Sequence, residues 1–359
     1  MAKASVRFTS EVNYHILVQP GIMAELAEQL RGSGLGPKVV IITDQAVNRL
    51  YGQDLEQMLQ TEGFVVDIVE LPVGEQYKSF STWSKIFGML KATGADRSTT
   101  IISLGGGVVG DQAGLVAGSW QRGIPLVQVP TTLLAQVDSS IGGKAAVNHL
   151  GMKNLVGVFK HPRLVLVDPI LLSSLPEEEY AAGLAEVVKT ALLAGPDFWN
   201  FLVHVQAALL GRDSAILTSV IERCLAYKAA IVSRDPEDLG ERRVLNLGHT
   251  IGHAIEELAS HAYSHGQAVS VGLCFALELS LHHGLDASVF EAARSMLLRF
   301  GLPVTAPGLD LARMLQLVQQ DKKARSGVTR WVLLPEVGQP LVTTDLPSGW
   351  QEILGRLLR

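Results

Sequence analysis

The sequence has no excess of basic residues. Lysine and arginine together number 30, against 35 aspartates and glutamates, which gives a formal net charge of -5. A protein surface that binds nucleic acid normally carries a basic excess. The charge balance therefore argues against a nucleic-acid partner.

Cysteine is also scarce. Cys224 and Cys274 are the two cysteines among 359 residues, which is too few for a disulfide framework or a thiolate metal site. We expect both to be reduced side chains in the core of a cytoplasmic protein.

Long apolar runs are missing as well. No uninterrupted run reaches the roughly 18 residues that a membrane span needs. The closest candidate, AVSVGLCFALELSLHHG, is interrupted by Glu278 and indicates a buried helix. The start of the chain, MAKASVRFTSEV, lacks the basic and then apolar pattern of an export signal. We therefore expect no membrane association and a cytoplasmic location.

The first half of the chain alternates between two patterns. Apolar, β-branched runs occur at 38–44, 64–70, 98–107, 124–132 and 163–168, and stretches with helical periodicity separate several of them. This alternation favours a Rossmann-like, doubly wound parallel sheet. From Glu177 onward helical patterns dominate, apart from a late strand-like run at 329–335. We predict an α/β domain over residues 1–175 and a mainly α-helical domain over residues 176–359.

A glycine-rich turn follows one of the predicted strands. In SLGGGVVGD, Gly105, Gly107 and Gly110 fit the pattern G-x-G-x-x-G and open an apolar helix. Glycines there permit a tight turn, and the helix N-terminus can face a phosphate. The acidic residue that normally follows about twenty residues later is missing. Asp44, at the end of an earlier strand, could take the ribose instead, and Thr131 and Thr132 could donate to the cofactor. The alternative is a tight turn with no ligand.

Four of the ten histidines fall within residues 245–269, and two of these four are spaced for one helix face. His249 and His253 stand four residues apart, although Thr250 excludes the H-E-x-x-H motif of zinc peptidases. His265 opens another apolar helix. Glu186 lies in small and apolar sequence, where a carboxylate is costly unless it is paired or bound to metal. One glutamate and two histidines make an open zinc site, although each residue could instead have a structural role.

Basic residues gather near glycine turns and histidines. The segment 138–162 looks like a long loop with Lys144, Lys153, Asn154 and Lys160, and such a loop is usually functional or mobile. Further members of this set are Arg122, Lys189, Lys228, Arg242, Asn246, Lys322 and Lys323. These cations could bind a phosphate or a carboxylate, although scattered basic residues are normally solvated.

Taken together, these motifs resemble the 3-dehydroquinate synthase family of the shikimate pathway over nearly the full length of the chain. The stretches that carry the resemblance are GEQYKS, GGGVVGDQAGLVAGSWQRGI, VPTTLLAQVDSSIGGKAAVN, KNLVGVF, GLAEVVK, LNLGHTIGHAIE, SHGQAV and DKK. The resemblance implies a NAD-binding α/β domain and a helical domain that binds metal and substrate.

The resemblance also implies specific site residues. Zn²⁺ (or Co²⁺) would be held by Glu186, His249 and His265. NAD would lie on Asp44, Glu75, Lys78, Gly106, Gly107, Asp111, Thr131, Thr132 and Lys153. The substrate would contact Asp138, Lys144, Asn154, Lys189, Lys228, Arg242, Asn246 and His253, with Arg122 reaching across a homodimer interface to its phosphate. The motif DKK leaves open which of Lys322 and Lys323 faces the substrate.

The implied reaction converts 3-deoxy-D-arabino-heptulosonate 7-phosphate into 3-dehydroquinate and phosphate. It proceeds by transient oxidation with NAD, β-elimination of phosphate, re-reduction and intramolecular aldol closure, so that the net reaction is that of a lyase. Three alternatives stay open: a sugar phosphate cyclase that forms an inosose or valiolone, a metal-dependent polyol dehydrogenase, and a noncatalytic nucleotide-binding protein.

Overall fold

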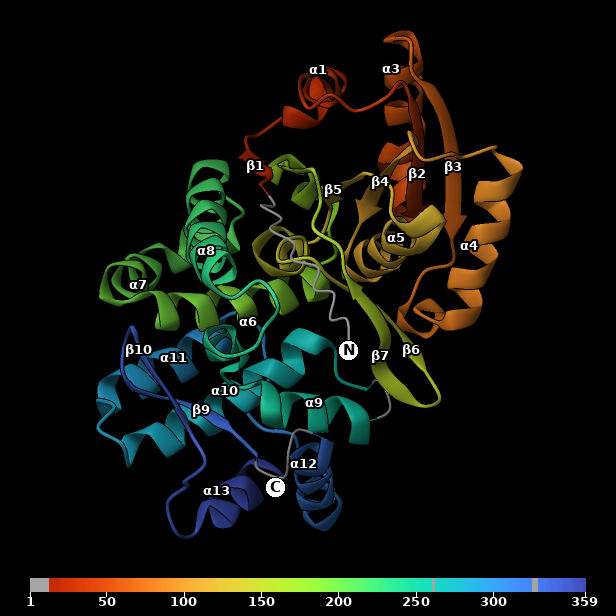
Figure 1. The fold of residues 1–359 in the computed structure, drawn as a ribbon. Helices are drawn as coiled ribbons and strands as arrows, with labels where there is room; N and C mark the ends of the chain where they lie inside the picture. Colours follow the sequence, from red (N-terminus) through yellow and green to blue (C-terminus); the bar gives the residue numbers. More distant parts are fainter. Residues whose placement is uncertain (1–12, 260–261, 325–328) are drawn as a thin grey trace, which may run out of the picture.

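The computed structural model describes residues 13–259, 262–324 and 329–359. A six-stranded parallel sheet forms the upper half of the molecule in Figure 1. Its spatial order is β1 (His15–Val18), β8 (Leu164–Val167), β5 (Leu126–Pro130), β4 (Thr100–Gly105), β2 (Lys38–Asp44) and β3 (Val65–Leu71). The predicted Rossmann-like sheet is thereby confirmed. Strand β1 was not expected from the sequence, and it joins the sheet at its edge through a tertiary pairing with β8.

Helices cover both faces of this sheet, which explains why its strands read as continuous apolar runs. On β2, Val39 and Ile41 pack with helices α1 (Leu26–Gly32) and α3 (Gln53–Thr61). Val40 and Ile42 point to the opposite face and pack with α4 (Phe80–Ala92) and α5 (Gly107–Ser119). Alternate residues of a strand point to opposite faces, so both sets are buried.

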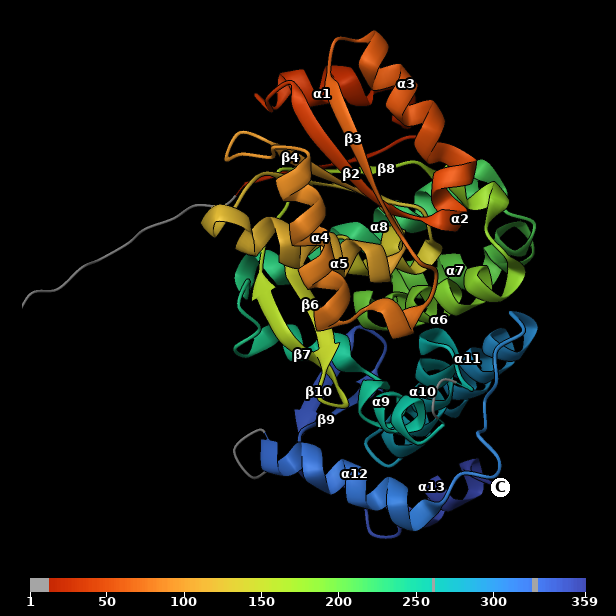
Figure 2. The same ribbon diagram turned by 90° about the vertical axis from the view of Figure 1, so that its right-hand side faces the viewer.

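The segment 138–162 is not the long loop that the sequence suggested. Most of it forms the antiparallel hairpin β6 (Lys144–His149) and β7 (Met152–Phe159), which extends from the sheet half toward the helical half (Figures 1 and 2). Ala145 and Val147 of β6 pack against Leu115 of α5. Three of the four glycines in this segment, Gly142, Gly143 and Gly151, have a positive φ and lie before the hairpin and at its tip, whereas Gly157 lies within β7.

The second half of the chain is mainly helical. Its helices are α6 (Glu177–Ala194), α7 (Pro196–Leu210), α8 (Ser214–Arg234), α9 (His249–Leu258), α10 (His265–Leu281), α11 (Ala287–Arg299), α12 (Leu311–Ala324) and α13 (Trp350–Leu357). The late strand-like run forms β9 (Trp331–Glu336), which pairs with β10 (Gln339–Thr343). Helices α6 and α10 are buried along most of their length and form the centre of this half.

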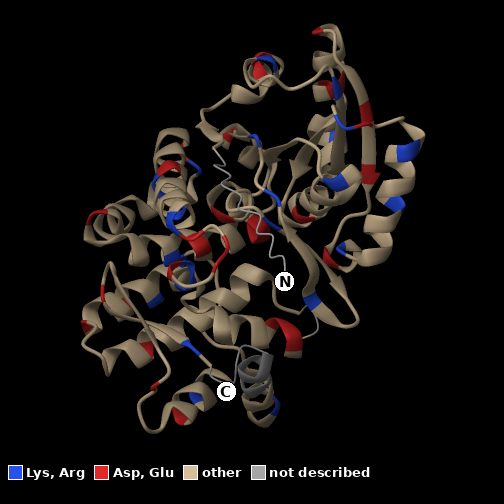
Figure 3. Cartoon of the chain, in the orientation of Figure 1, with Lys and Arg blue, Asp and Glu red and all other residues tan. Residues whose placement is uncertain are grey.

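Charged residues of both signs are interspersed along the outer helices (Figure 3). Within the part of the chain that the structure describes, no helix combines the length and apolarity that crossing a membrane requires.

Candidate active site between the sheet and the helical half

Three side chains from distant parts of the sequence converge in the helical half. Potential ligand atoms of Glu186, His249 and His265 all lie within 4.8 Å of one another. The Glu186 Oε1 atom is 3.4 Å from Nε2 of His249 and 3.2 Å from Nε2 of His265. The convergence that the sequence predicted is therefore present in the fold.

Local sequence signals place each of these side chains. Glu186 lies in the buried middle of α6, and the two histidines are the first residues of α9 and α10. Ser264 and Gln267 form a capping box that starts α10 at His265. Before His249, Gly248 adopts the left-handed conformation with a φ of 80°, and a Cβ atom there would lie 2.8 Å from the backbone nitrogen of Leu273. Glycine at this position lets α9 begin directly against α10.

The orientation of the two imidazole rings suits a metal ion. Each ring turns Nε2 toward Glu186 and Nδ1 toward an outer acceptor: the carbonyl oxygen of Leu247 for His249, at 3.2 Å, and Oε2 of Glu256 for His265, at 3.5 Å. An outer acceptor of this kind fixes the tautomer of a metal-binding histidine. The donor set of one carboxylate and two imidazoles fits Zn²⁺ or Co²⁺ and leaves positions for substrate oxygens.

Electrostatics keep the Glu186 carboxylate ionised although it has no exposed surface. Burial favours the neutral acid, but Lys189 and His249 outweigh it and hold the pKa of Glu186 well below its usual range. The Lys189 Nζ atom lies 2.5 Å from Glu186 Oε2. For His265, desolvation favours the neutral ring, but Glu186 and Glu256 outweigh it and raise the pKa to about 9.

Several predicted substrate contacts are held by polar partners, either beside this cluster or in the segments that follow it and precede it in the chain. The Lys228 Nζ atom lies 2.8 Å from Oδ1 of Asp138, and Arg242 donates to the carbonyl oxygen of Gly142 at 2.9 Å. Lys144 pairs with Asp238. Two further predicted substrate contacts lie beside the metal ligands: Lys189 is next to Glu186, and the ring centroid of His253 is 5.3 Å from that of His249. Asn246 is the last residue of the 3-10 helix Glu241–Asn246.

The predicted cofactor residues gather at the carboxyl edge of the sheet. The strand order reverses between β2 and β4, because the chain proceeds from β2 outward to β3 and then returns to β4 on the other side. Ligands of doubly wound sheets bind at such a switch point. Asp44 ends β2, and Gly106 and Gly107 lie where β4 turns into α5.

The glycine turn fits closely against the next loop. The amide of Thr131 donates to the carbonyl oxygen of Gly105 at 3.0 Å. A Cβ atom at position 106 would lie 2.8 Å from Cγ2 of Thr132. The turn therefore has no room for a side chain, and the N-terminus of α5 stays open to an anionic group.

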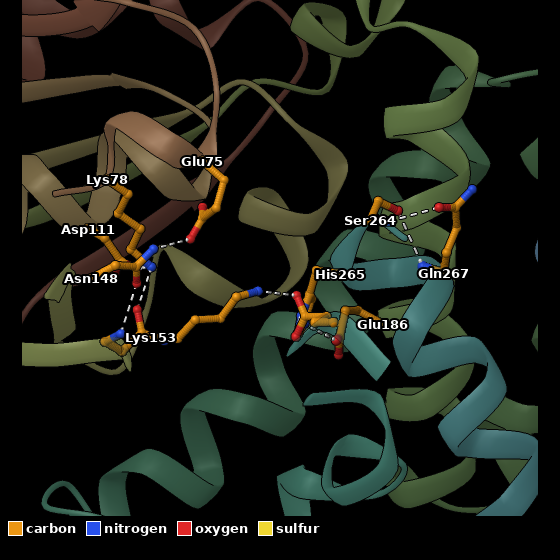
Figure 4. A network of polar contacts seen from close by, with 11 residues as sticks. Glu75, Lys78, Asp111, Asn148, Lys153, Glu186, Ser264, His265 and Gln267 are labelled. Carbon is orange, nitrogen blue, oxygen red and sulfur yellow. Dashed lines mark hydrogen bonds and ion pairs between the residues drawn. The ribbon is translucent and has the colours of Figure 1, made fainter. Parts of the chain in front are cut away.

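A second polar network extends this edge toward the hairpin (Figure 4). The Lys78 Nζ atom lies 2.5 Å from Oδ2 of Asp111 and donates to Oδ1 of Asn154 at 2.6 Å. Glu75 accepts from the side chain of Asn148 at 2.9 Å. Asn154, which we expected at the substrate, is thus held beside the predicted cofactor contacts.

Arg122 is not brought to this site within the chain. It follows α5, which begins at the glycine turn and is 13 residues long. At 1.5 Å per residue, the helix separates Arg122 from the turn by about 20 Å. Lys322 and Lys323 lie outside the described side chains.

Sequence reasoning missed Glu256, Asp238 and Asn148. Glu256 had a usable signal, because it stands seven residues after His249 and three after His253, on the same helix face. Together with His253 and His265 it forms a second group that could hold a metal ion. Asp238 and Asn148 lie on chain segments whose neighbours are set by the tertiary fold, so no spacing in the sequence could reveal them.

Comparisons with known proteins agree with this arrangement. Residues 68–182 match the family described as 3-dehydroquinate synthase N-terminal, and residues 183–324 match 3-dehydroquinate synthase C-terminal. A 3-dehydroquinate synthase of Dehalococcoides mccartyi (strain ATCC BAA-2266 / KCTC 15142 / 195) is 42% identical over 334 residues, which cover 93% of each chain.

Solved structures extend the comparison. The 2-epi-5-epi-valiolone synthase of Streptomyces hygroscopicus subsp. jinggangensis 5008, with NAD⁺ and Zn²⁺ bound, has a TM-score of 0.91 and 26% identity, covering 98% of each chain. A 2-deoxy-scyllo-inosose synthase complexed with carbaglucose-6-phosphate, NAD⁺ and Co²⁺ has a TM-score of 0.86 and 27% identity, covering 96% of this chain and 97% of the other.

Proposed function

The chain belongs to the 3-dehydroquinate synthase family, and we propose from this that it converts 3-deoxy-D-arabino-heptulosonate 7-phosphate into 3-dehydroquinate and phosphate. The observation that carries the proposal is the convergence of Glu186, His249 and His265 beside a set of buried cations. The enzyme uses NAD and Zn²⁺ or Co²⁺, and it is a lyase because NAD is regenerated in each cycle.

The two bound groups and the chain have separate tasks. When bound, NAD supplies a reversible hydride acceptor and the metal ion supplies a Lewis acid for neighbouring substrate oxygens. The chain supplies Glu186, His249 and His265 to the metal. It supplies the N-terminus of α5 to the cofactor, whose adenosine part we place near Asp44.

Anion binding falls to the buried cations. The substrate carries a carboxylate and a phosphate, and the buried Lys228 and Arg242, together with the exposed Lys144, lie where they can neutralise both. Lys228 and Arg242 are 7% and 4% exposed, so their charges act in an environment of low polarity, where electrostatic attraction is strong. Asn246 and Asp138 can hydrogen-bond the hydroxyl groups between the two anions.

Proton transfer concerns the groups beside the metal ligands. His253 and Lys189 lie close enough to the metal ligands to donate or accept hydrogen bonds at the reacting hydroxyls. The phosphate of the substrate itself is the base for its own elimination in this family. The chain then has to orient that phosphate and exclude water, which the junction between the two halves can do.

We further propose a cytoplasmic homodimer. Arg122 is exposed and about 20 Å from the glycine turn of its own chain, so it would reach the phosphate in the site of a partner subunit. Leu155 and Phe159 of β7 are 44% and 49% exposed, and such exposed apolar side chains support association with a second copy.

The test is a comparison of substrates. With NAD far below the substrate concentration, we expect phosphate release from 3-deoxy-D-arabino-heptulosonate 7-phosphate without accumulation of NADH. Glucose 6-phosphate, whose carba analogue is bound in the 2-deoxy-scyllo-inosose synthase, should release none. Phosphate release from glucose 6-phosphate alone would favour the rival cyclase, and stoichiometric NADH without phosphate would favour a polyol dehydrogenase.

A further inference from the structure

Glu256 contacts one group on each side of the junction between the two halves. It lies on α9 and is 8% exposed. Its Oε1 atom accepts a hydrogen bond from Nζ of Lys153 at 2.9 Å, and its Oε2 atom lies 3.5 Å from Nδ1 of His265. This buried carboxylate can therefore orient the side chains of both Lys153 and His265.

Toward the metal site, Glu256 determines which nitrogen of His265 is free. Because Nε2 of His265 faces Glu186, Nδ1 has to carry the proton when Nε2 binds a metal ion. The Glu256 carboxylate can accept that proton's hydrogen bond, which fixes the ring and makes Nε2 a better donor to the metal.

Toward the cofactor site, Glu256 holds Lys153. This lysine belongs to β7 of the hairpin, and its side chain runs from the hairpin toward His265 (Figure 4). Lys153 is also one of the residues that we assign to NAD. One carboxylate therefore connects a predicted NAD contact with a predicted metal ligand.

We propose that Glu256 is a positioning residue that holds His265 for the metal and, through Lys153, couples the metal site to the NAD site. The coupling has a defined sign. When NAD attracts Lys153, the cation withdraws from Glu256, and the carboxylate becomes a stronger acceptor for His265. NAD should then strengthen metal binding, and by linkage the metal should strengthen NAD binding by the same factor. The inference rests on the proposed function insofar as NAD and a metal ion occupy these sites.

The first experiment measures Co²⁺ affinity of metal-free protein by calorimetry, together with the visible absorption of bound Co²⁺. Loss of an outer hydrogen-bonding partner typically lowers metal affinity about 10- to 100-fold, and we expect this for Glu256→Gln, with an altered Co²⁺ spectrum. Glu257→Gln is the matched control, because Glu257 is exposed on the same helix and lines a different hollow with Arg313 and Gln316. Thermal unfolding of the metal-free variants separates this effect from a loss of structure.

The second experiment measures the coupling itself. The Co²⁺ affinity of the wild type should rise at least about fivefold in saturating NAD, the lower end of typical coupling between sites. Lys153→Met lacks this cation, so its Co²⁺ affinity without NAD should already be raised toward the value that the wild type reaches with NAD. At an NAD concentration that saturates the variant, NAD should add no further increase. This variant leaves Glu256 unchanged, so it tests the coupling even where Glu256→Gln fails to fold.

Three results would overturn the inference: unchanged Co²⁺ affinity and spectrum in Glu256→Gln, an undiminished NAD effect in Lys153→Met, or two ions per chain with Glu256 as a direct ligand. These measurements contain no substrate. Failure of the wild type to release phosphate would therefore refute the proposed function separately, and a catalytically active wild type without the coupling would refute only this inference.

Discussion

His265 combines a functional position with partial exposure. Its side chain is 34% exposed, whereas that of Glu186 is fully buried. Substitution of His265 should therefore remove the metal and leave the fold intact, whereas substitution of Glu186 should also lower the stability of the metal-free protein.

We expect His265→Ala to lose its metal and its activity while the fold persists. Removing a ligand removes the Lewis acid, which contributes several kcal/mol to such reactions, or at least about a thousandfold in rate. Elemental analysis measures the metal, and circular dichroism checks the fold. His282→Ala, at an exposed position after α10, is the control. Unchanged zinc content in His265→Ala would remove His265 from the ligand set.

Glu186→Gln should destabilise even the metal-free protein. The substitution leaves the Lys189 cation, which is 2% exposed, without its closest carboxylate. Removing one partner of a buried ion pair lowers the free energy of unfolding by about 3–5 kcal/mol. Urea unfolding measures this loss, and Glu186→Gln combined with Lys189→Met should recover part of it. A single variant as stable as the wild type would contradict the pairing.

At the residue scale, the sequence revealed those side chains whose type conflicts with their surroundings. Glu186 and Lys189 were visible because charge is expensive in an apolar helix. Glu256 was overlooked, because the pair Glu256-Glu257 looks like a solvated helix face. Its spacing from the histidines was the available signal, whereas its contacts with Lys153 and His265 come from the tertiary fold.

At the scale of elements, the loop between α8 and α9 is organised by one carboxylate. Asp235 accepts hydrogen bonds from the backbone amides of Leu239, Gly240 and Arg242, at 2.8, 2.8 and 2.9 Å. The amide donors of Arg242, Gly240 and Leu239 lower the pKa of Asp235 to about 2. The loop thereby presents Arg242 to the junction.

A folded-state pKa below that of the unfolded chain gives stability that is present above the unfolded value and lost as the pH falls. Relative to Asp235→Asn, the wild type should therefore be more stable at pH 6, and this advantage should shrink between about pH 4 and pH 2. Urea unfolding at pH 6 and pH 3 measures it. Asp54→Asn, at an exposed position of α3, is the control. An advantage of equal size at both pH values would contradict this role of Asp235.

The elements that could be predicted were those with a clear hydrophobic pattern or a clear capping signal. Buried parallel strands such as β2 and β4 stand out as apolar runs, and α10 begins at a capping box that spacing reveals. The hairpin β6–β7 was missed because its sequence is rich in glycine and mixed in polarity. It is held in place by α5, a tertiary contact that local sequence does not encode.

At the scale of the whole molecule, the fold alone does not decide between cyclases. The valiolone and inosose synthases share the architecture at TM-scores of 0.91 and 0.86 with 26% and 27% identity. Sequence distinguishes them, because 3-dehydroquinate synthases reach 42% identity over 93% of the chain. We propose that a few side chains at the junction distinguish the substrates, because the fold is shared by cyclases with different products.

The proposed dimer makes a prediction of its own. Arg122→Ala should raise KM about 10- to 100-fold, the effect of one hydrogen bond to a charged group, and should leave metal binding unchanged. If Arg122 acts across the interface, unfolding and refolding Arg122→Ala together with His265→Ala should restore activity. In the mixed dimer, one site has both an intact ligand set and Arg122 of the partner subunit. Mixtures no more active than their components would place Arg122 outside the partner's site.

The most direct test of the account is a metal titration of the stripped enzyme. Phosphate release from 3-deoxy-D-arabino-heptulosonate 7-phosphate, measured with catalytic NAD, should rise in proportion to added Zn²⁺ or Co²⁺ and level off at one ion per chain. Full phosphate release by the stripped enzyme, or a plateau at two ions per chain, would contradict the single site formed by Glu186, His249 and His265.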